Sequence, residues 1–343
     1  MGLWLAGLAL AAAYAMPACA QTPAKPTANQ TPIPPEKALP EKPAPEKSTP
    51  EKPAVPTLVG ENDFRCLASA SQGGAILCKA QPGIGVQLDG KTVARTDKDG
   101  LAVIGLTRTQ KSPAKITLVP PPAANPPAKP ILTTVSVKVA KRHDDVGSLE
   151  MECAKIAPQN DADKKKAADS WIKKENALKS FNDPQAPIAF AKPVEATDKQ
   201  YSISSFGRTR TYVPKTKDCE PTTNVHNGTD IAVPTGTEIH APMAGTVILA
   251  DPDLFFEGGC IFLDVGRGMV SVTMHMSRID VKPGQVVKQG ELMGLSGSTG
   301  RVTGPHVHWA IKYRNVFDKD RGSDIWLDPM LILKLDAAAL TTN

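Results

Sequence analysis

The sequence predicts a mainly β protein. Short strand-like apolar runs recur along most of the chain, and glycine- and proline-rich turn signals separate them. One stretch, residues 158–182, instead has the charged, alanine-rich character and the apolar spacing of a helix. With 343 residues, the chain is long enough for about two domains with their own cores. We therefore expect a small β domain, a connecting helix and a second domain built on an antiparallel β-sheet.

The first twenty residues have the features of a secretory signal. Residues 3–15 are almost wholly apolar, and Ala18-Cys19-Ala20 supplies a small-residue cleavage site. The apolar stretch is too short to span a membrane, so no spanning segment is expected after its removal. We expect residues 1–20 to be cleaved and the protein to be exported to the periplasm or cell envelope. Lipidation at Cys19 is the less favoured alternative.

Residues 21–57 form a low-complexity segment. Glu-Lys pairs recur in it every five residues, with prolines between them. Such a composition cannot bury a core and is typical of extended, polyproline-like chain. At ~3.1 Å per residue the segment would reach on the order of 100 Å. We interpret it as a tether rather than as a ligand for a proline-binding domain.

Residues 58–157 are expected to form the small β domain, a sandwich or a barrel. Its strand-like runs are residues 75–78, 85–88 and 135–139. Its hairpin turn signals are Asp89-Gly90 and Asp99-Gly100. Nothing in this part suggests catalysis, and His143, which precedes two aspartates, is expected to be a surface histidine.

Residues 158–195 are expected to be a helical linker. Four apolar side chains with roughly helical spacing should pack on a neighbouring domain; they are Trp171, Ile172, Leu178 and Phe181. Three prolines in residues 183–195 then end the helical pattern.

Residues 196–335 carry the predicted antiparallel sheet, and residues 336–343 are a tail. Two strand-like runs, residues 261–265 and 269–276, lie on either side of a glycine-rich turn. Further turn signals are Lys282-Pro283-Gly284 and Lys288-Gln289-Gly290. No long amphipathic helix interrupts this part of the sequence.

Three short stretches of this last domain hold four of the chain's six histidines and one aspartate. They are His226-Asn227-Gly228-Thr229-Asp230, Met274-His275-Met276-Ser277 and Gly304-Pro305-His306-Val307-His308. Residues two apart on a strand face the same way, so His306 and His308 are expected on one face. Imidazole and carboxylate are both good zinc ligands, and these spacings suit a zinc site with an open catalytic position.

Each stretch taken alone also has an ordinary structural explanation. The His306–His308 pair could be two stacked surface histidines, and Asp230 could accept a hydrogen bond in the turn that Asn227-Gly228 signals. His275 could be a core histidine bonded to a backbone carbonyl. We interpret His240, which has no partner in its sequence neighbourhood, as structural.

Taken together, the three stretches resemble the lysostaphin-type, or LytM-like, zinc endopeptidases of bacterial cell walls. The family pattern is H-x-x-x-D, then an H-[LM]-S-like segment, then G-x-x-x-G-P-H-x-H, and every position is filled between residues 226 and 308. The resemblance implies that His226, Asp230 and His308 bind Zn²⁺ and that His275 and His306 are the catalytic histidines. It also implies an antiparallel sheet of lysostaphin type.

The function that the resemblance implies is cleavage of peptide cross-links or stem peptides in peptidoglycan. An alternative is a non-catalytic or autoinhibited peptidoglycan-binding activator of another wall hydrolase, because the family contains members that have lost ligands. A third is a structural envelope protein whose histidines are incidental. A regulatory envelope protein is a further possible partner.

The cysteines and the net charge add two expectations. Removal of the signal leaves five cysteines, so at least one thiol is free or pairs externally in the oxidising compartment expected for an exported protein. Cys219 with Cys260 and Cys66 with Cys78 are the pairs that we consider. The net charge of +5 includes no block of basic residues interleaved with aromatic ones, so no nucleic-acid partner is expected.

Overall fold

The computed structural model describes residues 57–60, 64–119, 133–201, 205–318 and 322–340. The expected signal segment and nearly all of the expected tether lie outside these described residues, as does the Pro-rich stretch 120–132. No helix in the described ranges is long and apolar enough to cross a membrane.

Two sheets make up the N-terminal β region, which we define as the described residues from 57 to 140. One sheet has the order β1 (Leu58–Val59), β2 (Arg65–Leu67), β4 (Ala75–Lys79) and β7 (Leu101–Gly105). The other has the order β3 (Ser69–Ser71), β9 (Thr134–Ala140), β8 (Ala114–Val119), β5 (Gly85–Leu88) and β6 (Lys91–Arg95). The three strand-like runs predicted in this region are confirmed as β4, β5 and β9.

The two predicted turns of this region differ in what they connect. Asp89 and Gly90 both have positive φ, 49° and 87°, and they join β5 to β6 in an antiparallel hairpin, as predicted. Asp99-Gly100 is also a turn, but β6 and β7 belong to different sheets. The prediction of a second hairpin was therefore wrong, because a turn signal fixes the local reversal and not the strand that follows.

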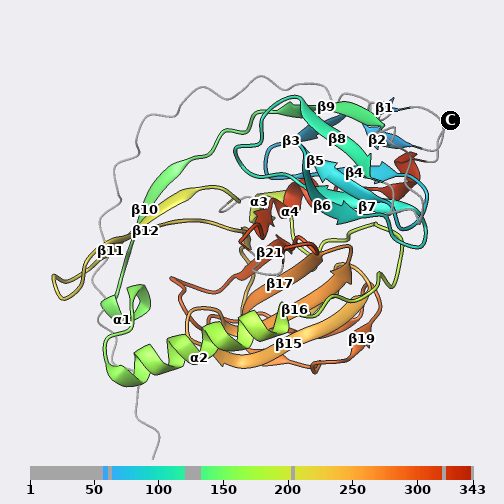
Figure 1. Cartoon of the computed structure of the whole chain (residues 1–343). Helices are drawn as coiled ribbons and strands as arrows, with labels where there is room; N and C mark the ends of the chain where they lie inside the picture. The colour runs from blue at the N-terminus through green and yellow to red at the C-terminus, as the bar shows by residue number, and fades with distance from the viewer. Residues whose placement is uncertain (1–56, 61–63, 120–132, 202–204, 319–321, 341–343) are drawn as a thin grey trace, which may run out of the picture. The chain divides into compact units, whose positions relative to one another are not determined.

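The C-terminal part of the chain contains a seven-stranded sheet, here called the main sheet (Figure 1). Its order is β13 (Thr229–Ile231), β21 (Val307–Tyr313), β17 (Met269–Met276), β16 (Gly258–Gly266), β15 (Gly245–Leu254) and β19 (Val286–Val287), with β22 (Ile325–Leu327) paired to β21. Every pairing in it is antiparallel, as predicted. A smaller sheet has the order β14 (Glu238–His240), β20 (Leu292–Leu295) and β18 (Arg278–Ile279).

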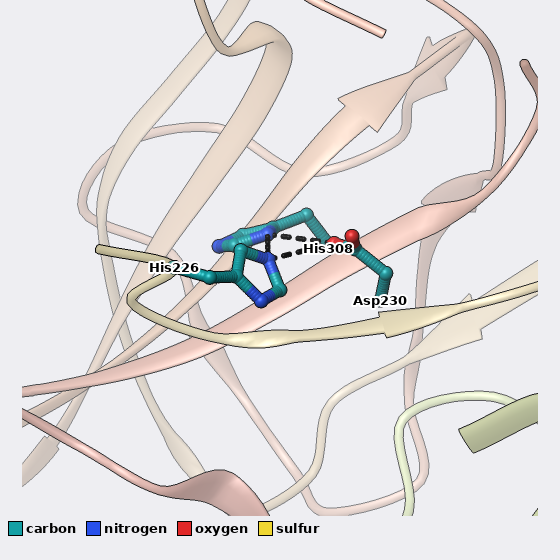
Figure 2. Close-up of side chains that lie close together, drawn as sticks. All are labelled: His226, Asp230 and His308. Atoms are coloured by element: carbon teal, nitrogen blue, oxygen red, sulfur yellow. Dashed lines mark hydrogen bonds and ion pairs between the residues drawn. The ribbon is translucent and has the colours of Figure 1, made fainter. Parts of the chain in front are cut away.

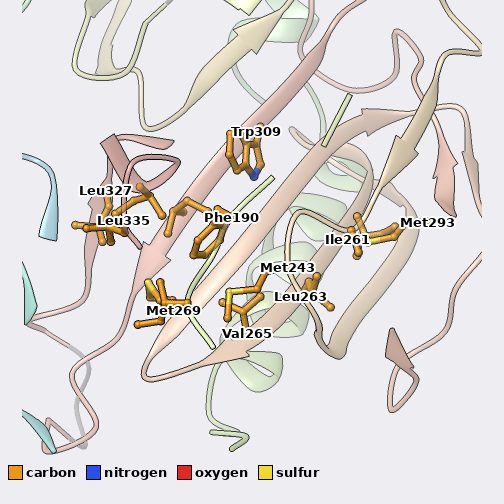
Figure 3. Packing of buried hydrophobic residues seen from close by; sticks show 14 of the residues in the cluster. Phe190, Met243, Ile261, Leu263, Val265, Met269, Met293, Trp309, Leu327 and Leu335 are labelled. Atoms are coloured by element: carbon orange, nitrogen blue, oxygen red, sulfur yellow. The ribbon is translucent and has the colours of Figure 1, made fainter. Parts of the chain in front are cut away.

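Burial on both faces explains the apolar run at residues 260–263 of β16, a strand in which every residue is buried. Ile261, Leu263 and Val265 pack in the large cluster shown in Figure 3, which also contains Trp309. Cys260 and Phe262 alternate with them and pack in a second cluster on the opposite face.

The large cluster also includes residues of the N-terminal β region. Leu77 of β4 and Val103 of β7 belong to it, together with Tyr313 of β21. The Tyr313 hydroxyl lies 3.0 Å from the carbonyl oxygens of both Val93 and Val103. The N-terminal β region and the main sheet therefore share an apolar core.

Helix α2 (Asp161–Ala177) lies within the stretch predicted to be helical and runs along β15 (Figure 1). The Asn160 side chain caps its N-terminus by accepting a hydrogen bond from the amide of Asp163. The expected apolar packing is largely absent, because Trp171 and Ile172 are 61% and 55% exposed and Phe181 is 43% exposed. Only Leu178, just after the helix, is buried as predicted.

Polar contacts attach α2 to the main sheet instead. The Ser170 hydroxyl accepts a hydrogen bond from the amide of Phe255, and Lys173 forms an ion pair with Asp251 at 2.6 Å. Periodicity predicted the helix correctly, but small and charged residues face the sheet where apolar residues were expected. The remaining helices are short: α1 (Cys153–Ile156), α3 (Asp198–Tyr201), α4 (Pro329–Ile332) and the 3-10 helix η1 (Ala337–Leu340).

A three-stranded sheet, here called the arm, lies beside the candidate metal centre described below. Strand β10 (Val146–Met151) pairs in parallel with β11 (Thr209–Pro214), which pairs antiparallel with β12 (Thr222–Val225). A disulfide joins Cys153 of α1 to Cys219, in the turn between β11 and β12. A second disulfide joins Cys66 to Cys78, as considered above.

The pairing of Cys219 with Cys260 was therefore wrong. Cys260 is a buried free thiol in the centre of the main sheet, where it packs with Leu254 and Phe262. Cys219 lies on the arm, where its disulfide partner is Cys153 of α1.

Candidate metal centre

Two neighbouring strands place the first two candidate ligands opposite each other. Asp230 of β13 and His308 of β21 are direct cross-strand partners in the antiparallel register. Gly228 leaves room for the His308 ring, because a Cβ atom at residue 228 would lie 2.6 Å from His308 Nε2. Cross-strand pairing thus joins two motifs that are 78 residues apart in the sequence.

His226 approaches the same point from the arm. It follows β12 directly, and its amide donates a hydrogen bond to the carbonyl of Arg208. Its Nε2 lies 3.0 Å from Asp230 Oδ1 and 3.0 Å from His308 Nδ1, and His308 Nδ1 lies 2.9 Å from the same Oδ1 (Figure 2). These three atoms therefore converge on one point.

The chemistry of these three groups fits a bound cation. His226 Nδ1 lies 3.0 Å from the carbonyl oxygen of Ser205, which can only accept, so that nitrogen carries the proton. Nε2 then faces the Asp230 carboxylate, and this is unfavourable unless a positive charge, either a proton on Nε2 or a metal ion, lies between them. A metal ion resolves this conflict, and an outer hydrogen bond that fixes the histidine tautomer is typical of metal ligands.

The electrostatic surroundings keep Asp230 ionised and His308 neutral. Burial raises the pKa of Asp230, but hydrogen bonds and charge interactions with His226 and His308 outweigh it and hold the pKa well below its ordinary value. Burial lowers the pKa of His308, against the opposing influence of Asp230. An ionised carboxylate and a neutral imidazole are the forms that bind a metal.

The second Asp230 oxygen, Oδ2, pairs with Arg210 of β11 at 2.6 Å. Sequence reasoning missed this arginine. The alternation of Arg208, Arg210 and Tyr212, which all line the same cleft, was the available signal.

His275 and His306 lie beside the three ligands, and their ring centroids are 4.8 Å apart. His275 Nδ1 lies 2.9 Å from the carbonyl oxygen of Thr299, and His306 Nδ1 lies 2.9 Å from that of Gly304. Because carbonyls only accept, both Nδ1 atoms carry protons and each ring keeps its Nε2 for chemistry in the cleft.

Backbone irregularity places His275 in the cleft. Its φ is 67°, in the left-handed region that few non-glycine residues adopt, and the pairing of β16 with β17 shifts register beside it. Burial and the neighbouring His306 and His308 hold its pKa well below the ordinary value, so its imidazole is neutral. A neutral imidazole in a cleft can accept a proton.

The two histidines outside the three motifs lie away from this group. His143 is exposed, as expected. His240 of β14 is half-buried, and its Nε2 lies 3.5 Å from Glu238 Oε2, so it has the partner that the sequence did not suggest.

A cleft of ≈ 330 Å³ opens over the three candidate ligands and the two neighbouring histidines, His275 and His306. Strands of the arm contribute to its lining, and so does the loop from residue 301 to residue 303. Lys155 of α1 donates a hydrogen bond to the carbonyl oxygen of Val302, 2.8 Å away, and so connects the arm side to this loop. Volumes of this size accommodate small ligands or a few residues of a peptide.

Part of the chain is similar in sequence to known proteins. Residues 224–319 match peptidase family M23. The chain is 38% identical over 117 residues to the peptidoglycan DD-endopeptidase ShyA of Vibrio cholerae, covering 34% of this chain and 26% of that protein. It is 34% identical over 111 residues to lysostaphin of Staphylococcus staphylolyticus, covering 32% of this chain and 22% of that protein.

Among solved structures, a candidate peptidase M23 from Pseudomonas aeruginosa is 27% identical and aligns over 77% of this chain and 94% of that one, with a TM-score of 0.49. The match spans about a quarter of the length of ShyA and of lysostaphin, the two curated relatives named above.

Proposed function

We propose that the protein, whose residues 224–319 match peptidase family M23, is an exported zinc metallopeptidase that cleaves peptide cross-links or stem peptides of bacterial peptidoglycan. The observation that carries the proposal is the convergence of His226, Asp230 and His308 within hydrogen-bond distance of one another. A relative whose name is peptidoglycan DD-endopeptidase supports the choice of a cross-link that involves D-amino acids.

His226, Asp230 and His308 would be the zinc ligands. Two imidazole nitrogens and one carboxylate oxygen leave an open coordination position, and zinc bound in this way lowers the pKa of a water at that position to about 7. Arg210 would hold the carboxylate in place through its second oxygen. No Glu of the H-E-x-x-H type is present in the sequence to act as the base.

His275 and His306 would move the proton and stabilise the developing charge. The Nε2 of one ring takes the proton of the attacking water. The other ring, when it carries a proton on Nε2 as well as on Nδ1, donates a hydrogen bond to the oxygen of the scissile carbonyl. Their fixed Nδ1 contacts hold both rings in position for these two tasks. The proton then passes to the leaving amine as the peptide bond breaks.

Export is the part of this proposal that rests on the N-terminal sequence. Peptidoglycan lies outside the cytoplasm, and residues 1–20 have the pattern of a signal that would deliver the protein there. The two disulfides are consistent with an oxidising compartment.

A second candidate is an autoinhibited or activating protein of the same family. The hydrogen bond from Lys155 to Val302 favours it, because this contact connects α1 to a loop that lines the cleft. A Lys155→Met variant tests the idea. An increase in the rate of wall digestion would support autoinhibition, and a rate equal to that of the unmodified protein would rule out this contact as its cause.

The metal-dependent reaction is tested by a His308→Ala variant, with His240→Ala as the matched control outside the cleft. We expect His308→Ala to purify without stoichiometric zinc and to digest no peptidoglycan, while His240→Ala keeps both properties. Metal content measured by mass spectrometry and digestion measured as soluble peptide release decide the outcome. A fully active His308→Ala protein would contradict the proposed mechanism.

A further inference from the structure

Two arginines of the cleft have no carboxylate partner among the residues that the structure describes. Five of the described charged side chains line the cleft: Arg208, Arg210, Asp230, Glu257 and Arg301. Arg210 pairs with Asp230, and Glu257 pairs with Lys174 of α2. Across the described part of the chain, the guanidinium groups of Arg208 and Arg301 form neither an ion pair nor a hydrogen bond. The uncompensated charge of the cleft walls is therefore positive.

Two aromatic rings hold Arg301 in place. Its guanidinium carbon lies 4.8 Å from the ring centroid of Tyr212 and 4.7 Å from that of Phe256. Its amide also donates a hydrogen bond to the carbonyl of Phe256. Aromatic rings contact a guanidinium through its face and leave its N–H edges free for an acceptor in the plane. Arg301 is thus a positioned donor without an acceptor.

A glycine makes room for Arg208. A Cβ atom at Gly147 of β10 would lie 2.7 Å from Arg208 Nη2, so a larger residue there would displace the guanidinium. The carbonyl of Arg208 accepts a hydrogen bond from the amide of His226, and Arg301 lies five residues before His306. Both arginines therefore line the cleft next to segments that carry the candidate metal centre.

We propose that Arg208 and Arg301 form a carboxylate-binding subsite and that the substrate is an acidic peptide whose carboxyl groups are free rather than amidated. This inference rests on the proposed peptidase function and specifies its substrate class. A guanidinium binds a carboxylate through two parallel hydrogen bonds and cannot make this contact with a neutral amide. A divalent cation held by one carboxylate and two neutral imidazoles would add to the positive potential that attracts such a substrate.

A matched pair of cross-linked stem peptides, identical except that the carboxyl groups are free in one and amidated in the other, tests the subsite. Binding of both peptides is measured by calorimetry on the full chain after removal of metal with a chelator. We expect the unmodified protein to bind the free-acid peptide roughly 10- to 100-fold more tightly than the amidated one, as charge-assisted hydrogen bonds imply.

Substitution of the arginines should remove this preference. In Arg208→Gln and Arg301→Gln we expect the affinity ratio to fall towards one, and Arg301→Lys should give an intermediate ratio because it keeps the charge and loses the planar fork. Arg278→Gln, whose ion pair with Asp280 lies outside the cleft, is the control and should keep the full ratio. Thermal unfolding of each variant verifies that it is folded.

Hydrolysis separates a failure of the subsite from a failure of the peptidase. If the zinc-loaded protein cleaves both peptides with equal kcat/KM and binds them equally, the subsite proposal is wrong while the peptidase function stands. If it cleaves neither but binds the free-acid peptide in an arginine-dependent way, the subsite stands and the peptidase function fails.

Discussion

Asp230 is the residue on which the candidate metal centre depends most. One of its oxygens contacts His226 and His308, and the other pairs with Arg210. The first oxygen is thus available to a metal while the second is held by the protein. Outer hydrogen bonds of this kind orient a ligand and tune its affinity for the metal.

Removal of Arg210 should weaken metal binding without removing a ligand. We expect Arg210→Ala to bind zinc about 10- to 100-fold more weakly, because the Asp230 carboxylate loses the group that fixes its orientation. Competition with a chromophoric chelator measures the affinity. Arg278→Ala is the control on the exposed surface, and equal affinities of Arg210→Ala and the unmodified protein would show that Arg210 does not position the carboxylate.

The sequence predicts the candidate ligands better than it predicts their surroundings. His226, Asp230 and His308 lie in short motifs of fixed spacing, so a pattern search can find them. The alternation of Arg208, Arg210 and Tyr212 marks one face of a strand, but no local spacing shows that this face approaches Asp230. Likewise, the positive φ of His275 arises from a register shift with β16 that no local sequence pattern reveals.

At the scale of elements, the arm is the part of the fold that the sequence did not predict. Residues 209–214 were not recognised as a strand, and the parallel pairing of β10 with β11 joins segments about 60 residues apart. Such non-local pairing depends on the path of the intervening chain, which includes α1 and α2. The error in the disulfide prediction has the same origin, since Cys153 reaches Cys219 only because of this path.

The Cys153–Cys219 disulfide should contribute more to stability than the Cys66–Cys78 disulfide. The first closes a separation of 66 residues and the second a separation of 12, and the loss of unfolded-state entropy grows with loop length. We expect the double variant Cys153→Ser/Cys219→Ser to lower the free energy of unfolding by about 2–4 kcal/mol. Denaturant titration measures this, and Cys66→Ser/Cys78→Ser is the comparison; a larger loss in the comparison variant would contradict the expectation.

At the scale of the whole described chain, Asp144 connects three parts of the molecule. It forms ion pairs with Arg108 and Arg142, and Arg142 also donates a hydrogen bond to the carbonyl of Phe206, next to the arm. Arg142 additionally pairs with Asp328 at the start of α4, at 3.5 Å. Together with the apolar core that Tyr313 shares with β7, these contacts join the N-terminal β region to the main sheet.

The stability that Asp144 contributes should depend on pH. Burial raises the pKa of Asp144, but the hydrogen bonds from Arg142 and Arg108 outweigh it, so the folded-state pKa lies below the ordinary 3.8. The ionised form therefore stabilises the folded state above pH ~4, and this contribution is lost as the pH falls through the lowered folded-state value. We expect Asp144→Asn to cost about 1–3 kcal/mol near pH 7 and progressively less below pH ~4.

Thermal unfolding of the unmodified protein and of Asp144→Asn between pH 7 and pH 2.5 measures this difference. Asp183→Asn is a suitable control, because Asp183 is exposed in the segment after α2, away from these contacts. A difference in unfolding temperature that stays constant over the whole pH range would mean that the charge of Asp144 is not the cause.

We propose that this protein hydrolyses peptide bonds of peptidoglycan with a metal held by His226, Asp230 and His308. The most direct measurement is the release of muropeptides from purified peptidoglycan, identified by mass spectrometry, before and after treatment with a chelator and again after zinc is restored. We predict products that disappear with the chelator and return with zinc, and their masses identify the bond that is cut. Zinc-loaded protein that releases no muropeptides, or products that persist without metal, would contradict the account.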